Sequence, residues 1–463
     1  MRKPFEITLR GRTTTDQLRT YLHLPFDVPE GIGRIDVQFE YSAAISAEPH
    51  VTGGNTVDLG LFDPRGVSFM AEGFRGWSGS ERRAVFVAAD DATPGYLPGP
   101  IFPGTWHVHL GFYKVAEAGC DYTVTVRLTP AESENAEARF PALLRLGDQP
   151  VSRPPKPDGW YKGELHCHSF HSDGDSDPRE VIRAAEALGL DFIALTDHNV
   201  MSHQAALKAL HTDLILIPGY EVTTYRGHWN IWGDQGWVDF RVVTAAQMRA
   251  ALQEAKRRGY LVSCNHPRPS GPPWEFEDVD AYDCVEIWNG PWRLMNDVAL
   301  AFWEARLKAG KRFVAVGGSD THFLKREHYH QLAHPTTYVR CDGPPSARGL
   351  LEGIRAGRVF VTESPDGPQL YVGSDERMMG EAVARPPDGR LAVWVQVIDA
   401  AGMTLELHGA QGCLYQRTID AAAQSLEVQL PASDTAFIRA QLVTRDSDEC
   451  IVHAISNPIY LLG

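Results

Sequence analysis

Nine side chains of the types that bind metal ions lie in the middle of this 463-residue chain. They are His166, His168, Asp173, His198, Glu221, His228, His266, Asp320 and His322. They occur in the short blocks HCHSFHSDG, LTDHN, PGYE, GHWN, NHP and GGSDTH, and almost every block ends a run of strand-forming residues. Mixed imidazole and carboxylate sets bind Zn, Mn or Fe. The pattern favours a metal-dependent hydrolase whose cofactor is two or three divalent metal ions.

The spacing within the blocks is that of a β-strand. His166 and His168 lie two positions apart, so a strand would point both imidazoles to the same face, where one ion can bind both. Asp320 and His322 repeat this spacing. Glu221 follows another strand, and its two carboxylate oxygens could bridge two ions. Distant segments are therefore expected to bring their side chains to one metal centre.

Three regions are expected to position these residues. Residues 1–150 contain short alternating runs separated by Gly, Pro and Asp, which predicts an antiparallel β-sandwich or jelly roll. The proline-rich segment LGDQPVSRPPKPDG, which contains Pro150, predicts a stiff linker. Residues 160–367 alternate strands and helices, and residues 368–463 return to short strands, which predicts a small C-terminal β-sandwich.

The alternation within 160–367 predicts a parallel sheet closed into a β/α barrel. The first helix has clear signals, with Asp177 as N-cap, Pro178 at the first helical position and Gly189 at the stop. Catalytic residues in such barrels lie at the carboxyl ends of the strands, where most of the candidate ligands are found.

Composition narrows the classes of function. The formal net charge is −15, which argues against non-specific binding to nucleic acid or to an anionic membrane. No apolar segment is long enough to span a bilayer, and no targeting segment is visible. Seven scattered cysteines without a CxxC motif are typical of a reducing compartment. We expect a cytoplasmic protein with a small-molecule substrate, and the oligomeric state stays open.

The order and spelling of the blocks resemble the PHP (polymerase and histidinol phosphatase) superfamily. HCHSFHSDG matches its first motif, HxHxxxSDG, TDHN matches the second, and SDTH matches the closing DxH. The resemblance covers about residues 160–330. Together with the flanking β regions, the chain looks most similar to the CehA/McbA-like metallohydrolases of that group. The resemblance implies a distorted seven-stranded β/α barrel with a trinuclear metal centre.

The resemblance also implies which residues hold which ion. The first ion would be held by His166, His168, Glu221 and Asp320. A second ion, bridged by Glu221, would be held by His228 and His266. The third would be held by Asp173, His198 and His322. Such ions would lower the pKa of a metal-bound water and polarise the substrate.

Other residues near the blocks are weaker candidates. Asp197, next to a ligand, is a candidate for orienting imidazoles, and Arg268, directly after NHP, is a candidate substrate clamp. His171 is expected at the rim rather than in the ligand set, and Cys167 is expected to be a buried thiol. Further cations lie near the blocks at Arg226, Lys325 and Arg326. Six tryptophans lie nearby, at positions 229, 232, 237, 274, 288 and 292.

Three functions stay open at this point. A phosphoesterase is the leading hypothesis, favoured by the cations near NHP and SDTH. The second is a hydrolase of carbamates, amides or carboxyl esters, including aryl esters, which the tryptophans and the CehA/McbA-like resemblance favour. The third is a non-catalytic binding protein in which the metal only stabilises the fold.

Overall fold

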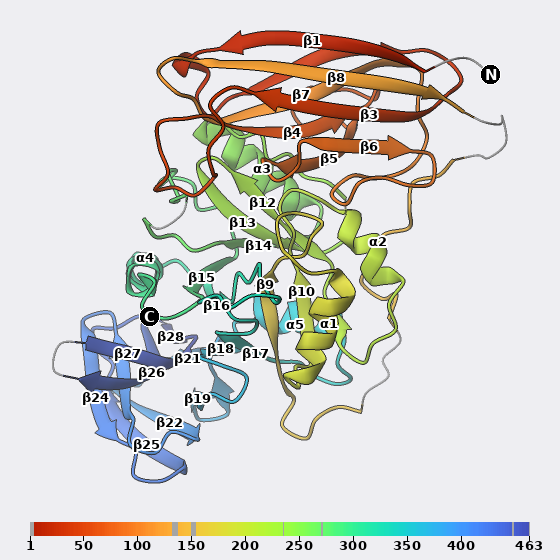
Figure 1. Cartoon of the computed structure of the whole chain (residues 1–463). Helices are drawn as coiled ribbons and strands as arrows, with labels where there is room; N and C mark the ends of the chain where they lie inside the picture. The colour runs from red at the N-terminus through yellow and green to blue at the C-terminus, as the bar shows by residue number, and fades with distance from the viewer. Residues whose placement is uncertain are drawn as a thin grey trace.

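The computed structural model describes residues 4–131, 138–149, 154–234, 236–269, 272–446 and 449–462. Its N-terminal strands form the uppermost part of Figure 1, a mixed α/β part lies beneath them, and C-terminal strands lie at the lower left. Pro150 and residues 151–153 of the predicted linker lie outside the described residues. The chain is thus a strand-rich α/β protein, as the sequence predicted.

The N-terminal part is built from two antiparallel four-stranded sheets, with strand orders β1-β8-β3-β6 and β2-β7-β4-β5. The strands are β1 (Phe5–Thr13), β2 (Tyr21–Val28), β3 (Ile32–Tyr41), β4 (Thr56–Phe62), β5 (Phe74–Gly79), β6 (Ala84–Ala88), β7 (Gly104–Lys114) and β8 (Cys120–Pro130), with a short 3-10 turn at Thr15–Gln17. Alternate side chains such as Ile35, Val37, Val108 and Leu110 face a shared apolar core between the sheets. This arrangement is the sandwich that the alternating runs predicted.

The central part alternates strands and helices. Its elements are β9 (Trp160–Cys167), α1 (Pro178–Ala187), β10 (Phe192–Leu195), α2 (Ser202–Lys208), β11 (Ile215–Leu216), β12 (Gly219–Thr224), β13 (Gly227–Trp232), α3 (Ala245–Arg257), β14 (Leu261–Cys264), β15 (Cys284–Asn289), α4 (Asn296–Lys308), β16 (Val314–Gly318), β17 (Thr336–Arg340), α5 (Ala347–Arg355) and β18 (Val359–Thr362). Helix α1 begins where its sequence signals place it. Asp177 accepts from the backbone N–H of Arg179, and Glu180 completes a capping box.

Strand pairing in the central part differs from a wholly parallel sheet. Strands β9, β10 and β11 are parallel, as are β14, β15 and β16, but β12, β13 and β14 pair antiparallel. The prediction of an all-parallel sheet was therefore wrong, because GHWN lies in the second strand of a hairpin. Isolated parallel bridges, Cys167 with Thr321 and His198 with Glu221, join the two sets of strands. Closure into a seven-stranded barrel stays a prediction.

The C-terminal strands form two layers over one apolar core. They are β19 (Gln369–Ser374), β20 (Arg377–Met378), β21 (Ala382–Ala384), β22 (Arg390–Ile398), β23 (Thr404–Gly409), β24 (Gly412–Thr418), β25 (Ala423–Pro431), β26 (Phe437–Asp446), β27 (Glu449–Ser456) and β28 (Ile459–Leu462). One layer has the order β20-β19-β22-β25. The other continues a sheet of the central part, because β27 pairs antiparallel with β18. The division into domains at residues 150, 160 and 368 stays a prediction, and hydrogen bonds cross the last boundary.

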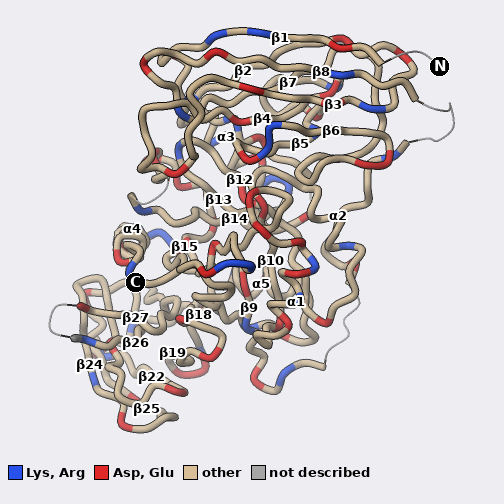
Figure 2. Tube along the Cα trace, in the orientation of Figure 1, with Lys and Arg blue, Asp and Glu red and all other residues tan. Residues whose placement is uncertain are grey.

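Acidic and basic residues are interspersed along the chain trace in Figure 2. Within the described residues, no helix has both the length and the apolar character needed to cross a bilayer.

Candidate metal centre

Strand β9 and the residue that follows it supply the first two candidate ligands. His166 and His168 face the centre, whereas the thiol of Cys167 points to the other side and packs with Val181 and Ile182 beneath α1. Both imidazoles are almost completely buried. The two-residue alternation of a strand thus gives the pair its common direction and makes Cys167 the buried thiol that its position predicted.

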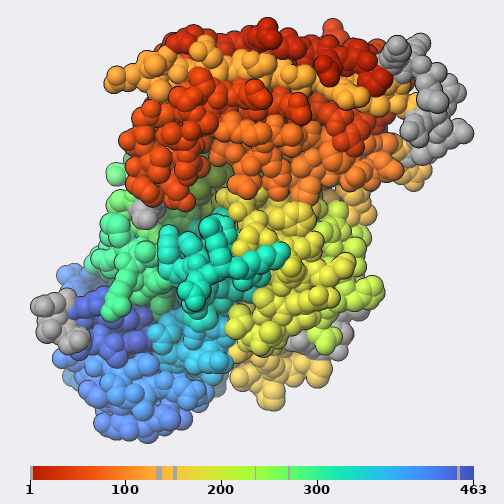
Figure 3. Space-filling model, in the orientation of Figure 1, coloured from red at the N-terminus to blue at the C-terminus, as the bar shows by residue number. Residues whose placement is uncertain are grey.

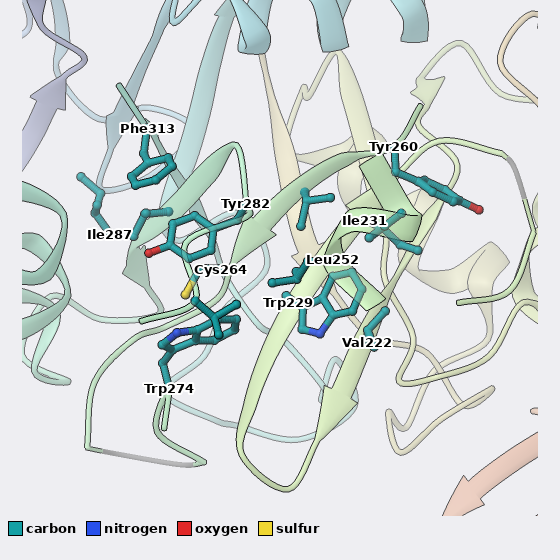
Figure 4. Packing of buried hydrophobic residues seen from close by; sticks show 14 of the residues in the cluster. Val222, Trp229, Ile231, Leu252, Tyr260, Cys264, Trp274, Tyr282, Ile287 and Phe313 are labelled. Atoms are coloured by element: carbon teal, nitrogen blue, oxygen red, sulfur yellow. The ribbon is translucent and has the colours of Figure 1, made fainter. Parts of the chain in front are cut away.

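The hairpin β12–β13 supplies the next two. Glu221 lies opposite Asn230, and His228 lies opposite Thr223, so these polar residues share one face of the hairpin. The intervening residues point the other way into the largest apolar cluster, where Figure 4 shows Val222, Trp229 and Ile231 among the packed side chains. Burial of that apolar face holds the hairpin in place and presents Glu221 to the centre.

Strand β16 approaches β9 closely. A Cβ atom on Gly318 would lie 2.4 Å from Cβ of His166, so this approach requires glycine. Asp320 follows with φ of 53°, and His266, after β14, has φ of 29°. Non-glycine residues rarely adopt such left-handed backbone conformations, and they often mark functional sites.

The nine residues predicted from the blocks are brought together. Nε2 of His166 lies 3.3 Å from Oδ1 of Asp320 and 3.4 Å from Oε1 of Glu221. Nε2 of His168 lies 3.0 Å from the same Asp320 oxygen. Nε2 of His266 lies 3.5 Å from Oε1 of Glu221. Two sets of donor atoms therefore converge, one on His166, His168 and Asp320 and one on His166, Glu221 and His266.

Glu221 lies between the groups. Its Oε1 is also 3.3 Å from Nδ1 of His228, and its Oε2 is 2.7 Å from Nδ1 of His198. The two oxygens of one buried carboxylate thus face different imidazoles. This is the geometry that a bridging carboxylate needs. His228 joins the centre through this contact.

A third group lies beside the first two. Nε2 of His322 is 3.3 Å from Oδ1 of Asp173 and 3.3 Å from Nε2 of His198. Nε2 of His198 is 3.6 Å from the same Asp173 oxygen. His168 also belongs to this group by distance, since its ring centroid lies 4.1 Å from that of His322. His168, which the resemblance assigned to the first ion, thus lies between two groups.

These distances fit shared metal ions. Ligand bonds of about 2.0–2.1 Å in tetrahedral geometry place neighbouring donor atoms about 3.3 Å apart. Nε2 of His166 and Oδ1 of Asp173 are buried and have no hydrogen-bond partner among the described residues. Buried polar atoms without partners are costly, so each calls for a partner such as a cation. The donor types and their spacing therefore fit two or three divalent ions.

Electrostatics keep the carboxylates ionised. Burial alone would raise the pKa of Glu221, but His166, His228 and His198 hold it well below its usual value. Burial would likewise raise the pKa of Asp320, and His166, His168 and His322 hold it well below its usual value. Ionised carboxylates are the form that binds metal ions.

Several side chains that support the ligands were not predicted. Oε1 of Glu286 lies 2.8 Å from Nδ1 of His166, which leaves Nε2 of that imidazole facing the centre. The other oxygen of Glu286 accepts from the backbone N–H of His266 at 3.0 Å. Asn265 donates to Oε1 of Glu221 at 2.9 Å. A signal for Glu286 exists in the sequence, because it is the single charged residue in the apolar strand Cys284–Asn289.

Asp197 has a different role from the one predicted. Its carboxylate accepts hydrogen bonds from the backbone N–H and the hydroxyl of both Ser169 and Ser172. The imidazole that it faces is His203, at 3.5 Å, which is outside the nine. Asp197 therefore shapes the loop that carries Asp173 and does not orient a candidate ligand.

Arg268 was predicted to clamp the substrate, and the contacts contradict this. Its side chain is buried, with 6% exposure. Nη1 donates to the carbonyl oxygen of Asn289 at 3.0 Å and to Oδ1 of Asn296 at 2.9 Å, and Nη2 donates to Oδ1 of Asn289 at 2.6 Å. The guanidinium thus fastens the segment that leads into α4. Adjacency to a ligand in sequence did not reveal the direction of the side chain.

The other cations near the blocks also have partners. Arg226 pairs with Glu275 and Lys325 pairs with Glu180, while Arg326 stacks over the ring of Phe323. Nδ1 of His171 lies 2.8 Å from the hydroxyl of Ser202, outside the ligand groups, as expected.

The tryptophans near the blocks serve mainly as core. Trp229, Trp232 and Trp288 are almost fully buried. Trp274 belongs to the same apolar cluster as Trp229 and Trp288, and Trp237 and Trp292 pack against it. The tryptophan density therefore reflects packing behind the centre.

Residues 164–262 match the model of the family described as PHP domain, and this part of the chain belongs to the PHP superfamily. The match includes six of the nine candidate ligands, from His166 to His228. It ends before His266, Asp320 and His322.

Two curated proteins are similar over short stretches. A 5'-3' exoribonuclease of Haemophilus influenzae is 38% identical over 65 residues, which is 14% of this chain and 24% of that protein. An error-prone DNA polymerase of Nocardia farcinica is 42% identical over 73 residues, which is 15% of this chain and 6% of the polymerase. The chain thus spans a quarter or less of these relatives.

Solved structures resemble the chain more weakly. A two-domain protein from Bacteroides vulgatus, containing a predicted PHP-like metal-dependent phosphoesterase, aligns with 70% of this chain and 99% of its own at 18% identity and a TM-score of 0.35. An amidohydrolase from Chromobacterium violaceum aligns with 35% of this chain and 88% of its own at 16% identity and a TM-score of 0.26. Neither similarity supports a conclusion about the reaction.

Proposed function

We propose that the chain is a metal-dependent hydrolase, and that its leading substrate class is a phosphoester. The observation that carries the proposal is the convergence of imidazole and carboxylate groups from distant segments. Eight of the nine residues fall into three groups of donor atoms, and His228 joins them through its contact with Glu221. Nε2 of His166 and Oδ1 of Asp173 are buried atoms without a hydrogen-bond partner among the described residues, and a shared cation would satisfy both. The PHP match over residues 164–262 supports the same class of centre.

Each group of ligands has a defined part in this proposal. His166, His168, Glu221 and Asp320 would hold one ion. Glu221 would share a second ion with His228 and His266. A third would be held by Asp173, His198 and His322. When bound, such ions supply a nucleophilic water near neutral pH and polarise the substrate oxygen.

The residues of the chain orient these groups. Oε1 of Glu286 accepts a hydrogen bond from Nδ1–H of His166, which directs Nε2 to the centre. Nδ1 of His322 lies 2.9 Å from the carbonyl oxygen of Asp320, which fixes Nε2 of His322 in the same way. Fixed imidazoles lose little freedom when they bind an ion, which favours tight binding.

The contacts of the cations near the ligand blocks favour a second candidate function. The cations that would have favoured phosphate are each used elsewhere, because Arg268 binds Asn289 and Asn296, and Arg226 and Lys325 lie in ion pairs. With these three cations engaged elsewhere, charge neutralisation would come mainly from the ions. A carbamate, amide or carboxyl ester needs less such neutralisation, which favours the CehA/McbA-like alternative.

Parallel turnover assays test these proposals. Manganese-loaded protein is assayed with p-nitrophenyl phosphate, bis(p-nitrophenyl) phosphate and a naphthyl carbamate. Preferential turnover of either phosphate supports the phosphoesterase, and preferential turnover of the carbamate supports the alternative. Bound metal without turnover of any of the three favours a non-catalytic role in stabilising the fold.

Variants link activity to the centre. His166→Ala and Asp320→Ala should each lower metal content and turnover together. His211→Ala is a matched control, because His211 is exposed and lies outside the nine. If purified protein binds no stoichiometric divalent metal, and both ligand variants behave as wild type, the proposed centre is wrong.

A further inference from the structure

The loop that carries Asp173 is held from two sides. On the inside, Asp197 accepts from the N–H groups and hydroxyls of Ser169 and Ser172. On the outside, the guanidinium of Arg82 donates to the carbonyl oxygen of Ser172 at 2.8 Å and also to that of Phe170. Asp173 follows Ser172 directly, so these hydrogen bonds with Asp197 and Arg82 fix the position of its carboxylate.

Arg82 belongs to the N-terminal sandwich, in the turn between β5 and β6. Val85 of β6 is buried in the core of the sandwich, and Trp77 of β5 packs in the apolar cluster that also contains Val222 and Trp229 of the central part. Figure 3 shows the orange N-terminal residues lying against the yellow segment that contains this loop. The side chain of Arg82 thus joins the sandwich to the loop of the third ligand group.

A second contact joins the sandwich to the same loop. The backbone N–H of Gly95 donates to the hydroxyl of Ser202 at 3.0 Å, and that oxygen lies 2.8 Å from Nδ1 of His171. A Cβ atom on Gly95 would lie 2.7 Å from the carbonyl oxygen of His171, so the two backbones are in close contact. The loop is therefore packed against the sandwich as well as hydrogen bonded to it.

The planar guanidinium of Arg82 is suited to holding the loop that carries Asp173. A guanidinium offers several N–H donors in a fixed plane and can bind two carbonyl oxygens at once, which fixes their mutual orientation. Loss of these two hydrogen bonds would leave the carbonyl oxygens of Phe170 and Ser172 without the guanidinium, and the loop would keep only its contacts with Asp197, Gly95 and Ser202 and its backbone hydrogen bonds. The carboxylate of Asp173 would then sample more orientations, and binding an ion with His198 and His322 would cost more conformational entropy.

We propose that Arg82 is a positioning residue for the ion held by Asp173, His198 and His322, so that the N-terminal sandwich completes the metal centre. The inference rests on the proposed metal centre but not on the identity of the substrate. Changes to groups that orient ligands weaken metal affinity about 10- to 100-fold. Arg82→Ala should therefore weaken this ion by about tenfold and leave the ions bound by Glu221 unaffected.

Cobalt titration of metal-free full-length protein tests the inference. Asp173→Asn identifies the absorption band of the ion in question, as the band that this variant loses. In Arg82→Ala the same band should need about tenfold more Co²⁺ to reach half-saturation. Arg82→Lys, which keeps the charge but not the guanidinium, should fall between Arg82→Ala and wild type.

Arg83→Ala is the matched control. Arg83 lies in the same turn, but its guanidinium stacks over the ring of Tyr41, at 3.7 Å, within the sandwich. This variant should fill all cobalt bands as wild type does. An unshifted band in Arg82→Ala, or an equal shift in Arg83→Ala, refutes the inference alone. No cobalt band in wild type refutes the metal centre and the inference together.

Discussion

The carboxylate of Glu286 provides the sharpest test of how the centre is organised. It is buried, with 2% exposure, and it binds three partners. Oε1 accepts from Nδ1 of His166 at 2.8 Å, and Oε2 accepts from the N–H of His266 and the side-chain amide of Asn289, both at 3.0 Å. Glu286→Gln keeps the shape of this residue and changes only its charge and donors.

Neither orientation of the glutamine satisfies all three partners. If its oxygen accepts from His166, its NH₂ group faces two other donors, the N–H of His266 and the amide of Asn289. If the amide is reversed, its NH₂ group faces Nδ1 of His166, which must give up its proton and hold it on Nε2. That tautomer removes the lone pair that would bind an ion.

The magnitude follows from these conflicts. Each buried group left unsatisfied costs about 1–3 kcal/mol. Loss of a group that orients a ligand lowers metal affinity by about 10- to 100-fold, or about 1.4 to 2.8 kcal/mol. We therefore expect Glu286→Gln to weaken the tightest metal binding by at least about tenfold and to lower the stability of the metal-free protein.

Competition with a chelator of known affinity measures the change in metal binding. The matched control is Glu406→Gln, which alters another buried carboxylate that contacts Gln441 and Arg445 in the C-terminal strands. This control should lower stability without changing metal affinity. Unchanged metal affinity in Glu286→Gln would refute the role assigned to this residue.

Three further outcomes are expected. Saturating Mn²⁺ should raise the midpoint of thermal unfolding, because a ligand at a thousandfold its Kd stabilises the folded state by about 4 kcal/mol. A chelator should reverse this rise. An unchanged midpoint would argue against specific binding. Arg268→Lys should lower the free energy of unfolding by about 2 kcal/mol in chemical denaturation, because lysine cannot bind Asn289 and Asn296 at once. The KM should stay unchanged. A raised KM at unchanged stability would support the prediction from the sequence that Arg268 binds the substrate. Burial raises the pKa of Asp58 to about 7, although the hydroxyl of Tyr225 donates to it and partly offsets this rise. Its neutral form is therefore favoured by folding, and the associated stability is full below about pH 4 and is lost as pH rises to about 7. Asp58→Asn should flatten this part of the profile, and an unaltered slope in denaturation midpoints would contradict the assignment.

The candidate ligands could be predicted because their signal is local. His166 and His168, or Asp320 and His322, are recognisable from two-residue spacing within one strand end. The residues that orient them come from other strands. The only local signal for Glu286 is that its charge interrupts an apolar strand. Its partner, His166, lies on another strand and could not be identified before the fold was known.

The direction of individual side chains and the pairing of strands were harder to predict from the sequence. Arg268 follows His266 by two positions, but the left-handed conformation of His266 turns the chain there, and the guanidinium points to Asn289. The strand that contains His228 was not identified from the sequence. Its apolar face, formed by Trp229 and Ile231, was the available signal.

The seam between β18 and β27 has a consequence for how the chain can be cut. Phe360, Val361 and Thr362 pair with Ser456, Ile455 and Ala454, and the side chain of Asn457 is hydrogen bonded to the backbones of Ala315 and Val359. A protein truncated after residue 368 would expose the edge of β18 and leave the backbone of β16 without this partner. Bare strand edges recruit other chains. Shortened versions made to isolate the metal-binding part should therefore self-associate unless the last strands are supplied as a separate peptide.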